Sequence, residues 1–519
     1  MHVSHFISRL LLAVLVLCGG VAWYVAASNR GATEFYFHHD HVLGTSLDLH
    51  AVAVDEATAE IAETAVLDEV ERLRRIFSLY DPESELSRLN RTAGEFAASP
   101  ELIEVLHHYE HFQAISGGAF NGQLGELVRV WKDAEKADRL PDEAVLSRIV
   151  HQVRQPGWRI DGAAHTITRL TDQPLNLNSV AKGFIIGRAM AAAREKAPTL
   201  RGFMINLGGD MAAWGVDEDG QRDWRIGVQD PAAPHDNGPV LAQVKLRDRA
   251  IATSGGYERF YLIQGKRHSH LFDPRTGRSA ESIAGATVIA ADNVIANALA
   301  TTLCILPPEE GLRLIAKTPG TDCLIVTREG KQVRSPGFAG MEFAMVAHVG
   351  DLVGQVGGAV VGQAPKAKAW PAGYQVNLSI TLPKITDTKK YRKPYVAVWI
   401  ENESNEPIRT ITVWGNSNRY WKDLPKWWAF AKSDNALVRA VTKATRPPGA
   451  YSVVWDGKND KGIAVGQGTF NVFVEVHREH GKLVRQTGTI ECLAKAATIT
   501  LDANAETGDT VINYTNKKK

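Results

Sequence analysis

The sequence predicts two folded domains, a mixed α/β domain followed by a β-sandwich-like domain. Strand and helix patterns interleave as far as about residue 345. Residues 350–370 are then rich in glycine, alanine and valine and end in a basic stretch, which is typical of a linker. Beyond the linker, short stretches of alternating apolar and polar residues are separated by turn residues, as in antiparallel sheets. A chain of 519 residues has room for both domains.

The first element is an apolar N-terminal segment. Arg9 precedes a run from Leu10 to Ala27 that no polar face interrupts, and its length is near the lower limit for a membrane-spanning helix. Val25-Ala26-Ala27 also resembles a signal-peptide cleavage site. We expect residues 1–27 to be a signal or membrane anchor, with an uncleaved inner-membrane anchor favoured. Either route places the remaining chain outside the cytoplasm.

The α/β domain is expected over residues 28–349. It opens with a predicted strand at residues 45–54, in which Asp48 and His50 alternate with apolar residues. A helix follows across Val66–Phe77, where apolar residues recur at helical spacing. Another helix is predicted to begin at Ser99-Pro100, because serine is a good N-cap and proline is favoured in the first turn.

The second domain, residues 371–510, is predicted to be a β-sandwich. Stretches such as YQVNLSITL, YVAVWIEN and TFNVFVEVHRE alternate in polarity, and Asp456-Gly457 fits a tight turn. The domain is rich in tryptophan, and most such residues are expected in the core rather than in a docking patch. These tryptophans are Trp399, Trp414, Trp421, Trp427, Trp428 and Trp455.

Composition and missing motifs exclude several functional classes. The net charge of +1 gives no basic footprint for nucleic acid. The four cysteines lie far apart without a C-x-x-C pair, so neither a zinc site nor a thioredoxin-like centre is indicated, while a disulfide stays open. The sequence also has no P-loop, no H-E-x-x-H and no complete G-x-G-x-x-G.

Glycine- and hydroxyl-rich turns remain as carriers of chemistry. Residues 177–183, LNSVAKG, precede an apolar helix, and a lysine with free N–H groups at a helix start can hold a pyrophosphate. A capped helix with a solvated lysine is an equally good interpretation. The paired glycines of INLGGD, residues 205–210, permit close backbone approach, although an ordinary turn is the simpler interpretation.

Two later loops are denser in polar groups. TSGGYERF at residues 253–260 and HSHLFDPRTG at residues 268–277 crowd hydroxyls, histidine, aspartate and arginine around one short strand pair, which favours a functional role. Asn297 and Thr301 are four residues apart in an apolar helix, so their oxygens face the same side. A helix with scattered polar residues is the alternative for that pair.

Taken together, the motifs resemble those of the ApbE family. The ordered set LGT, FSLYDPESELSRLN, GAFNGQLGELVRVW, LNLNSVAKGF, INLGGD, IATSGGYERF, HLFDPRTG and ANALATTL matches that family across about residues 35–345. Each motif alone is weak, but eight in the right order are specific. WDGKNDKGIAVGQGTFNVFVEVHREHG resembles a secreted domain of unknown function that follows some ApbE-like modules.

The resemblance implies a magnesium-dependent FAD:protein FMN transferase, which moves FMN from FAD onto a threonine or serine of an exported flavoprotein and releases AMP. Carried over by position, magnesium would be held by the carbonyl of Ser179 with Asn297 and Thr301. We add the hypothesis that His270 or Asp273 deprotonates the acceptor hydroxyl, because a base must lie close to that proton. The implied FAD contacts are Leu43, Tyr80, Ala119, Phe120, Asn121, Asn176, Lys182 and Leu271.

The chain also departs from the family pattern. The family usually has aspartate where this chain has Asn121, Asn176, Asn297 and Gly187. An amide supplies an oxygen but not the charge that magnesium prefers, so metal binding should weaken unless pyrophosphate oxygens, or Asp210 and Asp292, compensate. Two other functions therefore stay open. The first alternative to the transferase is a periplasmic protein that binds FAD without transferring it. The second is a scaffold whose β-rich domain docks a membrane electron-transfer partner.

Overall fold

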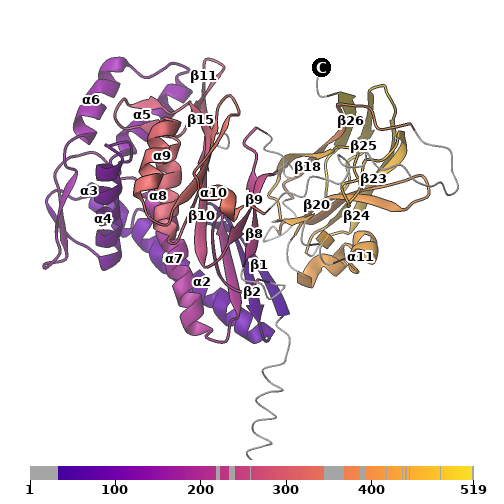
Figure 1. Ribbon diagram of the computed structural model, residues 1–519, viewed down its shortest axis with the longest axis horizontal. Helices are drawn as coiled ribbons and strands as arrows, with labels where there is room; N and C mark the ends of the chain where they lie inside the picture. Colours follow the sequence, from indigo (N-terminus) through magenta and orange to yellow (C-terminus); the bar gives the residue numbers. More distant parts are fainter. Residues whose placement is uncertain are drawn as a thin grey trace, which may run out of the picture.

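The computed structural model describes residues 33–217, 223–232, 240–256, 259–343, 368–385, 392–415, 418–434, 437–438, 441–443, 445–479 and 481–516. The predicted anchor at residues 1–27 and most of the predicted linker lie outside these ranges. Within these ranges, no helix is long and apolar enough to cross a membrane. Figure 1 shows the α/β domain and the β-rich domain as two separate lobes.

The centre of the α/β domain is an eight-stranded sheet in which every neighbouring pair is antiparallel. The predicted strand at residues 45–54 is confirmed as β2. In sheet order the strands are β1 (Thr33–Val42), β2 (Thr45–Ala53), β6 (Gly202–Leu207), β7 (Asp210–Gly215), β10 (Arg249–Gly255), β15 (Ile283–Ala290), β16 (Asp322–Thr327) and β17 (Gln332–Arg334).

Helices cover one face of this sheet and enclose the main core (Figure 1). The helix expected across Val66–Phe77 lies within α2 (Glu56–Phe77), whose N-cap Asp55 accepts a hydrogen bond from Thr58 N. The start predicted at Ser99-Pro100 is confirmed, because Ser99 caps α4 (Pro100–Ile115) by accepting from Leu102 N. The other covering helices are α7 (Asn178–Lys196), α8 (Asn293–Leu303) and α9 (Pro308–Lys317).

The opposite face of the sheet is covered by a β-hairpin and a short helix. β8 (Trp224–Gln229) and β9 (Val240–Leu246) pair with each other, and α10 (Phe338–Met341) adds the fully buried Phe338. These elements form a second, smaller apolar cluster with residues of the sheet. Because the sheet is buried on both faces, its loops at the strand ends are the surface left for a ligand.

Smaller elements complete the α/β domain. They are α3 (Glu85–Arg91), α5 (Gly125–Lys136), α6 (Glu143–Val153), the three-stranded sheet of β3 (Glu95–Ala97), β4 (Trp158–Asp161) and β5 (Thr166–Arg169), and the hairpins β11 (Phe260–Ile263) with β12 (Lys266–Ser269) and β13 (Phe272–Asp273) with β14 (Arg278–Ser279). Both hairpins lie in the chain between β10 and β15.

Cys304 and Cys323 of this domain, and Cys492 of the next, are buried free thiols, so no disulfide joins these three.

The second domain is a sandwich of two sheets around one core, as predicted. One sheet has the order β22 (Gly449–Trp455), β18 (Tyr374–Leu382), β26 (Thr510–Asn516) and β25 (Ala497–Leu501). The other has the order β21 (Thr442–Lys443), β20 (Pro407–Trp414), β19 (Tyr395–Glu401), β23 (Gly468–His477) and β24 (Val484–Cys492). β20 and β21 pair in parallel. Trp399, Trp414 and Trp455 are fully buried, as expected of core residues.

The alternating pattern did not predict a helical layer outside the five-stranded sheet. A 3-10 helix, η3 (Asn418–Asp423), and α11 (Pro425–Ala431) pack there with Trp421 and Trp427. Proline at the first position of α11 favours a helix start, and the tryptophans supply its apolar face.

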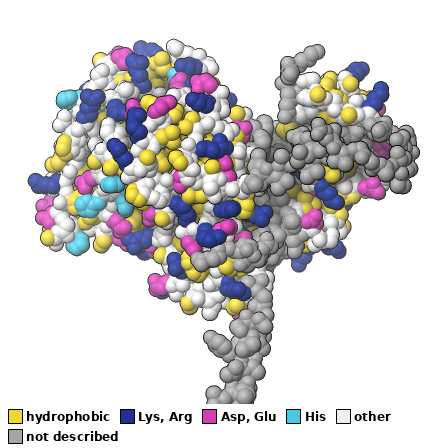
Figure 2. All heavy atoms as spheres, viewed as in Figure 1, with side chains coloured by type: hydrophobic (Ala, Val, Ile, Leu, Met, Phe, Trp, Pro, Cys, Tyr) yellow, Lys and Arg dark blue, Asp and Glu magenta, His cyan; other side chains and the backbone are white. Residues whose placement is uncertain are grey.

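On the face of the α/β domain drawn in Figure 2, basic and acidic side chains are interspersed, in line with the near-zero net charge.

Candidate functional site

The turns that carry the sequence motifs lie at one side of the eight-stranded sheet, where strands end and turns connect them. We call this side the edge of the site. Leu207 at the end of β6 pairs with Leu47 of β2 and with Asp210 of β7, which places the β1–β2 turn beside the β6–β7 turn. Ile251 of β10 pairs with Met211, so β10 runs past Asp210 and ends at the same edge. β15 starts there too, since Gly255 pairs with Gly285. Motifs that are up to about 240 residues apart in sequence therefore meet at one edge.

The helices α7 and α8 carry the three proposed metal ligands, Ser179 on α7 and Asn297 and Thr301 on α8. α7 starts at this edge and runs away from it, because β6 begins at the far edge, whereas α8 follows β15 and runs back. The two helices are therefore antiparallel, with Ser179 and Thr301 at their site ends. They approach closely at Gly183, where a Cβ would clash with the carbonyl of Asn293 and lie 3.0 Å from Asn297 Cβ.

A buried polar network joins these helices to the sheet. Asp210 is buried, and its Oδ2 lies 2.9 Å from Lys182 Nζ and accepts a 2.8 Å hydrogen bond from Asn297 Nδ2. Its Oδ1 accepts from Thr253 N at 3.2 Å. Burial raises the pKa of the Asp210 carboxyl, whereas the Lys182 ammonium and the N–H donors act against that shift.

Lys182 is partly exposed and also donates to Gly208 O at 3.1 Å. Two of its three N–H donors are thus satisfied within the described protein, which leaves one for a ligand. Gly208 itself has a φ of +55° and must be glycine, because a Cβ would clash with Thr45 on the β1–β2 turn. The close approach expected at INLGGD therefore exists, and its partner is a neighbouring turn.

The residues present fit a hard divalent cation. Asn297 Oδ1 is buried and has no hydrogen-bond partner in the described part of the chain, which is costly unless a ligand completes it. Thr301 Oγ1 lies 3.3 Å from Ser254 Oγ of β10. Amide, hydroxyl and carbonyl oxygens are ligands that Mg²⁺ accepts. No group of three His, Cys, Asp or Glu side chains among the described residues offers a metal site elsewhere.

The expectation of free N–H groups at the start of α7 needs correction. Leu177 provides no side-chain cap there, but the buried Tyr109 hydroxyl donates to Asn176 O at 3.3 Å. Val180 N and Ala181 N donate to Leu177 O at 3.1 and 2.8 Å. These two N–H groups are therefore already used within the protein, and Lys182 is the cationic group near this helix start.

The proposed FAD contacts at residues 119–121 lie in a buried turn after α4. Ala119 N and Phe120 N donate to Ser116, at O (3.3 Å) and Oγ (3.0 Å), so these N–H groups are already used. The Asn121 amide donates from Nδ2 to Val153 O at 2.9 Å and accepts from Gln123 N at 2.7 Å. The turn is held rigid next to Asn176, whose N–H donates to Gly122 O at 2.8 Å.

Leu43, Tyr80 and Leu271 come from three different loops. Leu43 has a φ of +52° in the β1–β2 turn and packs partly against the main core, as Leu271 does. Tyr80 follows α2 and is 94% exposed, although it is a large aromatic residue. A bound aromatic ring system would cover such a side chain. Asn176 Oδ1 accepts from Asn178 N at 3.3 Å, which leaves its NH₂ group for a ligand within the described site.

The two candidates for the base, His270 and Asp273, differ in whether a basic atom is left without a hydrogen-bonding partner in the described site. His270 Nδ1 lies 3.0 Å from the Arg259 carbonyl oxygen, which can only accept, so Nδ1 carries the proton and Nε2 is the basic nitrogen. Burial lowers the pKa of His270, which keeps it neutral. Asp273 is bound by Arg275 through both oxygens at 2.9 Å, and Arg275 N donates to the same carboxylate. The hypothesis of Asp273 as a free base is therefore not supported.

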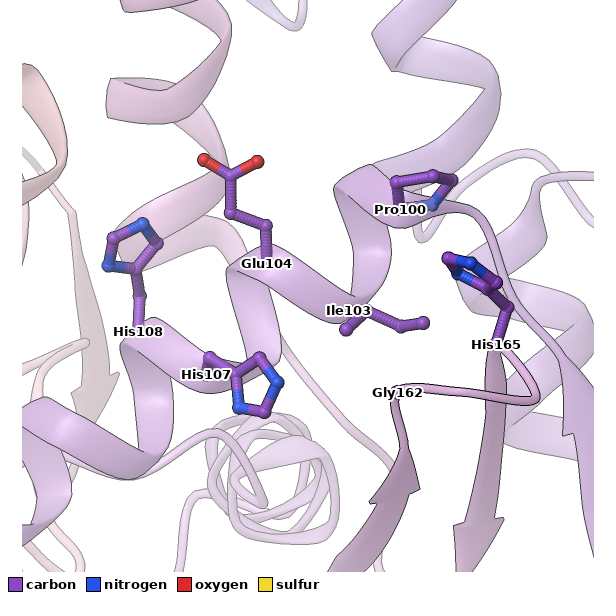
Figure 3. A pocket seen from close by; sticks show the side chains of 7 residues that line it. All are labelled: Pro100, Ile103, Glu104, His107, His108, Gly162 and His165. Atoms are coloured by element: carbon purple, nitrogen blue, oxygen red, sulfur yellow. The ribbon is translucent and has the colours of Figure 1, made fainter.

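An open pocket elsewhere does not belong to this site. Its lining includes Glu104, His107 and His108 of α4 and His165 of the β4–β5 turn, which are labelled in Figure 3. Glu104 is paired with Arg188 at 2.6 Å and His107 with Glu110 at 2.9 Å. The side chains in Figure 3 point in different directions, so they do not converge on one ligand.

Sequence reasoning gave no site role to Tyr109 or Ser254, and it treated Asp210 only as a stand-in metal ligand. Tyr109 lies in an apolar helical pattern that predicts a core residue, and nothing local indicates that its hydroxyl reaches α7. Asp210 and Ser254 stand in the INLGGD and IATSGG motifs, so the motifs marked the region. Only the strand register shows that they contact Asn297 and Thr301.

Comparisons with known proteins match both domains. The ApbE family matches residues 43–325, and a family described as a predicted periplasmic protein, DUF2271, matches residues 375–509. The FAD:protein FMN transferase of Treponema pallidum is 29% identical over 349 residues, covering 63% of this chain and 92% of that protein. The one from Rhodobacter capsulatus is 29% identical over 334 residues, covering 63% of this chain and 61% of that protein.

Solved structures agree with the fold of the first domain. The ApbE protein from Thermotoga maritima has a TM-score of 0.55 and 25% identity, covering 60% of this chain and 100% of that one. The flavin transferase ApbE from Vibrio cholerae has a TM-score of 0.51 and 25% identity, covering 60% of this chain and 99% of that one.

Proposed function

The chain belongs to the ApbE family, and from this premise we propose that it is an FAD:protein FMN transferase. It moves FMN from FAD to a threonine or serine hydroxyl of an exported flavoprotein and releases AMP. The observation that carries the proposal is the crossing of α7 and α8. There Lys182 of α7 and Asn297 of α8 both contact Asp210, which supports a shared site at this edge. The transferases of Treponema pallidum and Rhodobacter capsulatus support the same reaction.

The reaction exchanges the phosphoanhydride link of FAD for a phosphoester link to the acceptor. The acceptor oxygen forms a bond to the phosphorus of the FMN half, the pyrophosphate link to the AMP half breaks, and the hydroxyl proton leaves to a base. His270 Nε2 is the base that we propose, because its neutral imidazole has a lone pair at that nitrogen. The remaining N–H donor of Lys182 would neutralise charge on the pyrophosphate.

Magnesium is the proposed cofactor. The carbonyl of Ser179, Asn297 Oδ1 and Thr301 Oγ1 would hold it, and the unpartnered buried Asn297 Oδ1 supports this assignment. When bound, the ion supplies positive charge that stabilises the pyrophosphate oxygens. Because the three protein oxygens are neutral, we expect FAD itself to strengthen cation binding.

FAD is proposed to lie along the sheet edge. Tyr80 would cover the flavin ring, since this exposed aromatic side chain needs an apolar partner. Leu43 and Leu271 would flank the nucleotide from their loops, and the Asn176 NH₂ group would donate to it. In the buried turn of Ala119, Phe120 and Asn121, the contacts would come from backbone carbonyls, because the N–H groups of Ala119 and Phe120 are used.

The proposed location is the periplasm. The DUF2271 match describes the second domain as a predicted periplasmic protein. We propose that residues 1–27 tether the chain to the inner membrane, with the catalytic domain at residues 28–349, a linker at 350–370 and the β-rich domain at 371–510. The partner is the acceptor flavoprotein.

Incubation of the full chain with FAD, Mg²⁺ and a protein domain that bears an acceptor threonine tests the function. We expect AMP by chromatography and covalent flavin on the acceptor by in-gel fluorescence and mass spectrometry. Omission of Mg²⁺, and an acceptor with threonine changed to alanine, are the controls. Bound FAD without AMP or covalent flavin would favour the non-catalytic FAD-binding protein, and no FAD binding would favour the scaffold.

A further inference from the structure

Asp210 has no substrate role in the function proposed above, yet it lies at the centre of the site. It is a charged side chain with only 4% of its surface exposed, and burial of a carboxylate is costly unless donors surround it. Four N–H or ammonium groups could satisfy it, and three are found at 2.8–3.2 Å, from Asn297, Lys182 and Thr253. These donors come from α8, α7 and β10, so Asp210 links all three elements.

The contact between Asp210 and Asn297 fixes the direction of an amide. A side-chain amide has a donor end and an acceptor end, and rotation by half a turn exchanges them. Asp210 Oδ2 accepts from Nδ2 at 2.8 Å, which turns Oδ1 away from the carboxylate. That oxygen is the buried atom without a partner in the described structure. The carboxylate thus determines which end of the amide is left for a cation.

We propose that Asp210 is a positioning residue that orients Asn297 so that Oδ1, and not the NH₂ group, is presented to a divalent cation. This inference rests on the proposed function. Asp210 also holds Lys182 Nζ at 2.9 Å, which keeps the ammonium at the same edge.

A reciprocal exchange of the two side chains tests the orientation. In Asp210→Asn, either end of the new amide can face Asn297, so the Asn297 amide is free to turn. We expect the Kd for Mg²⁺, measured by titration calorimetry on the full chain with FAD bound, to rise at least about tenfold. In the double variant Asp210→Asn/Asn297→Asp, the amide donates to a carboxylate at 297, and we expect the affinity to return to the wild-type value or better.

Two further measurements separate positioning from folding. In Asp210→Asn the KM for Mg²⁺ should rise by a larger factor than kcat at saturating Mg²⁺ falls, whereas loss of folded protein would lower kcat and leave the KM unchanged. Asp292→Asn is the matched control. This substitution removes a carboxylate from the N-cap of α8. The new asparagine can accept the same hydrogen bonds from Val294 N and Ile295 N, so Mg²⁺ affinity should stay unchanged.

Several results would overturn the inference. An unchanged Kd in folded Asp210→Asn would do so, and so would a double variant that binds Mg²⁺ as weakly as the single one. FMN transfer by a wild-type chain that binds no divalent cation would overturn this inference and the proposed cofactor, and would leave the transfer reaction standing. Wild-type protein that binds FAD and Mg²⁺ without transferring FMN would contradict the proposed function and leave the positioning role standing.

Discussion

At the scale of single residues, Asn121, Asn176 and Asn297 use their side-chain amides in different ways. Asn121 needs its amide, because Nδ2 donates to Val153 O and a carboxylate could not. Asn176 uses only its oxygen inside the described protein, so a carboxylate could replace it there. Asn297 uses its nitrogen to contact Asp210 and leaves its oxygen without a partner. The same residue type is thus structural at one position and part of the site at another.

The pH dependence of transfer should identify the base. Burial lowers the pKa of His270 below its ordinary value of 6.5, and the charge of Arg259 acts in the same direction. The basic form is the neutral one, so kcat/KM should rise with pH, level off, and show an apparent pKa below 6.5. His270→Ala should remove this acidic limb and lower kcat by about 10²–10⁴-fold.

Asp273→Asn is the comparison for that experiment. Asp273 is bound to Arg275, so we expect the variant to keep the acidic limb. Retention of the limb in His270→Ala, or its loss only in Asp273→Asn, would show that His270 is not the base.

At the scale of elements, the site depends on how closely α7 and α8 approach. Gly183 allows this approach, because its missing Cβ leaves space for the Asn293 carbonyl and Asn297. The antiparallel course of the two helices follows from the sheet, since each is tied to a strand that starts or ends at a known edge. Site geometry here is a property of helix packing and not of one loop.

Two glycines in α7 provide a matched test of this packing. Gly183→Ala should lower the free energy of unfolding by about 1–3 kcal/mol, because the new methyl group forces α7 away from α8. It should also weaken Mg²⁺ binding, since Asn297 must shift. Gly187→Ala meets nothing within 4 Å and should be neutral or raise stability by up to about 1 kcal/mol.

Urea unfolding of both variants and Mg²⁺ titration of the folded proteins measure these effects. Equal stability of the two variants would contradict the packing argument.

At the scale of the whole molecule, the chain has two separate main cores. The main core of the α/β domain and the core of the sandwich share no residues. The aromatic pair of Tyr36 with Trp421, with ring centroids 6.4 Å apart, connects the two domains. All proposed FAD and metal contacts lie in the first domain, so catalysis should not need the second.

Removal of residues 344–519 tests this independence. We expect the shortened chain to bind FAD with the affinity of the full chain, because no proposed contact is lost. If the β-rich domain docks the acceptor, transfer to the natural flavoprotein should slow while transfer to a short acceptor peptide stays the same. Equal rates on both acceptors would show that docking is not the role of this domain.

The predictions from sequence succeeded where the signal is local. The strand at residues 45–54, the helix across Val66–Phe77 and the start at Ser99 depend on periodicity and capping within one segment, and all three are present. The α11 layer was missed, because alternation in the neighbouring strands masked a seven-residue helix. The expectation of free N–H groups at the start of α7 was wrong for Val180 and Ala181, because both donate to Leu177 O when the first helical turn closes.

The sequence by itself therefore determined the fold class, the order of the two domains and the family. The tertiary structure alone decided that Asp210 orients Asn297, that Asp273 is held by Arg275, and that α7 and α8 cross at Gly183. The reason is physical. Periodicity and turn chemistry act between near neighbours in the chain, whereas a hydrogen bond between β7 and α8 exists only after the strands have paired.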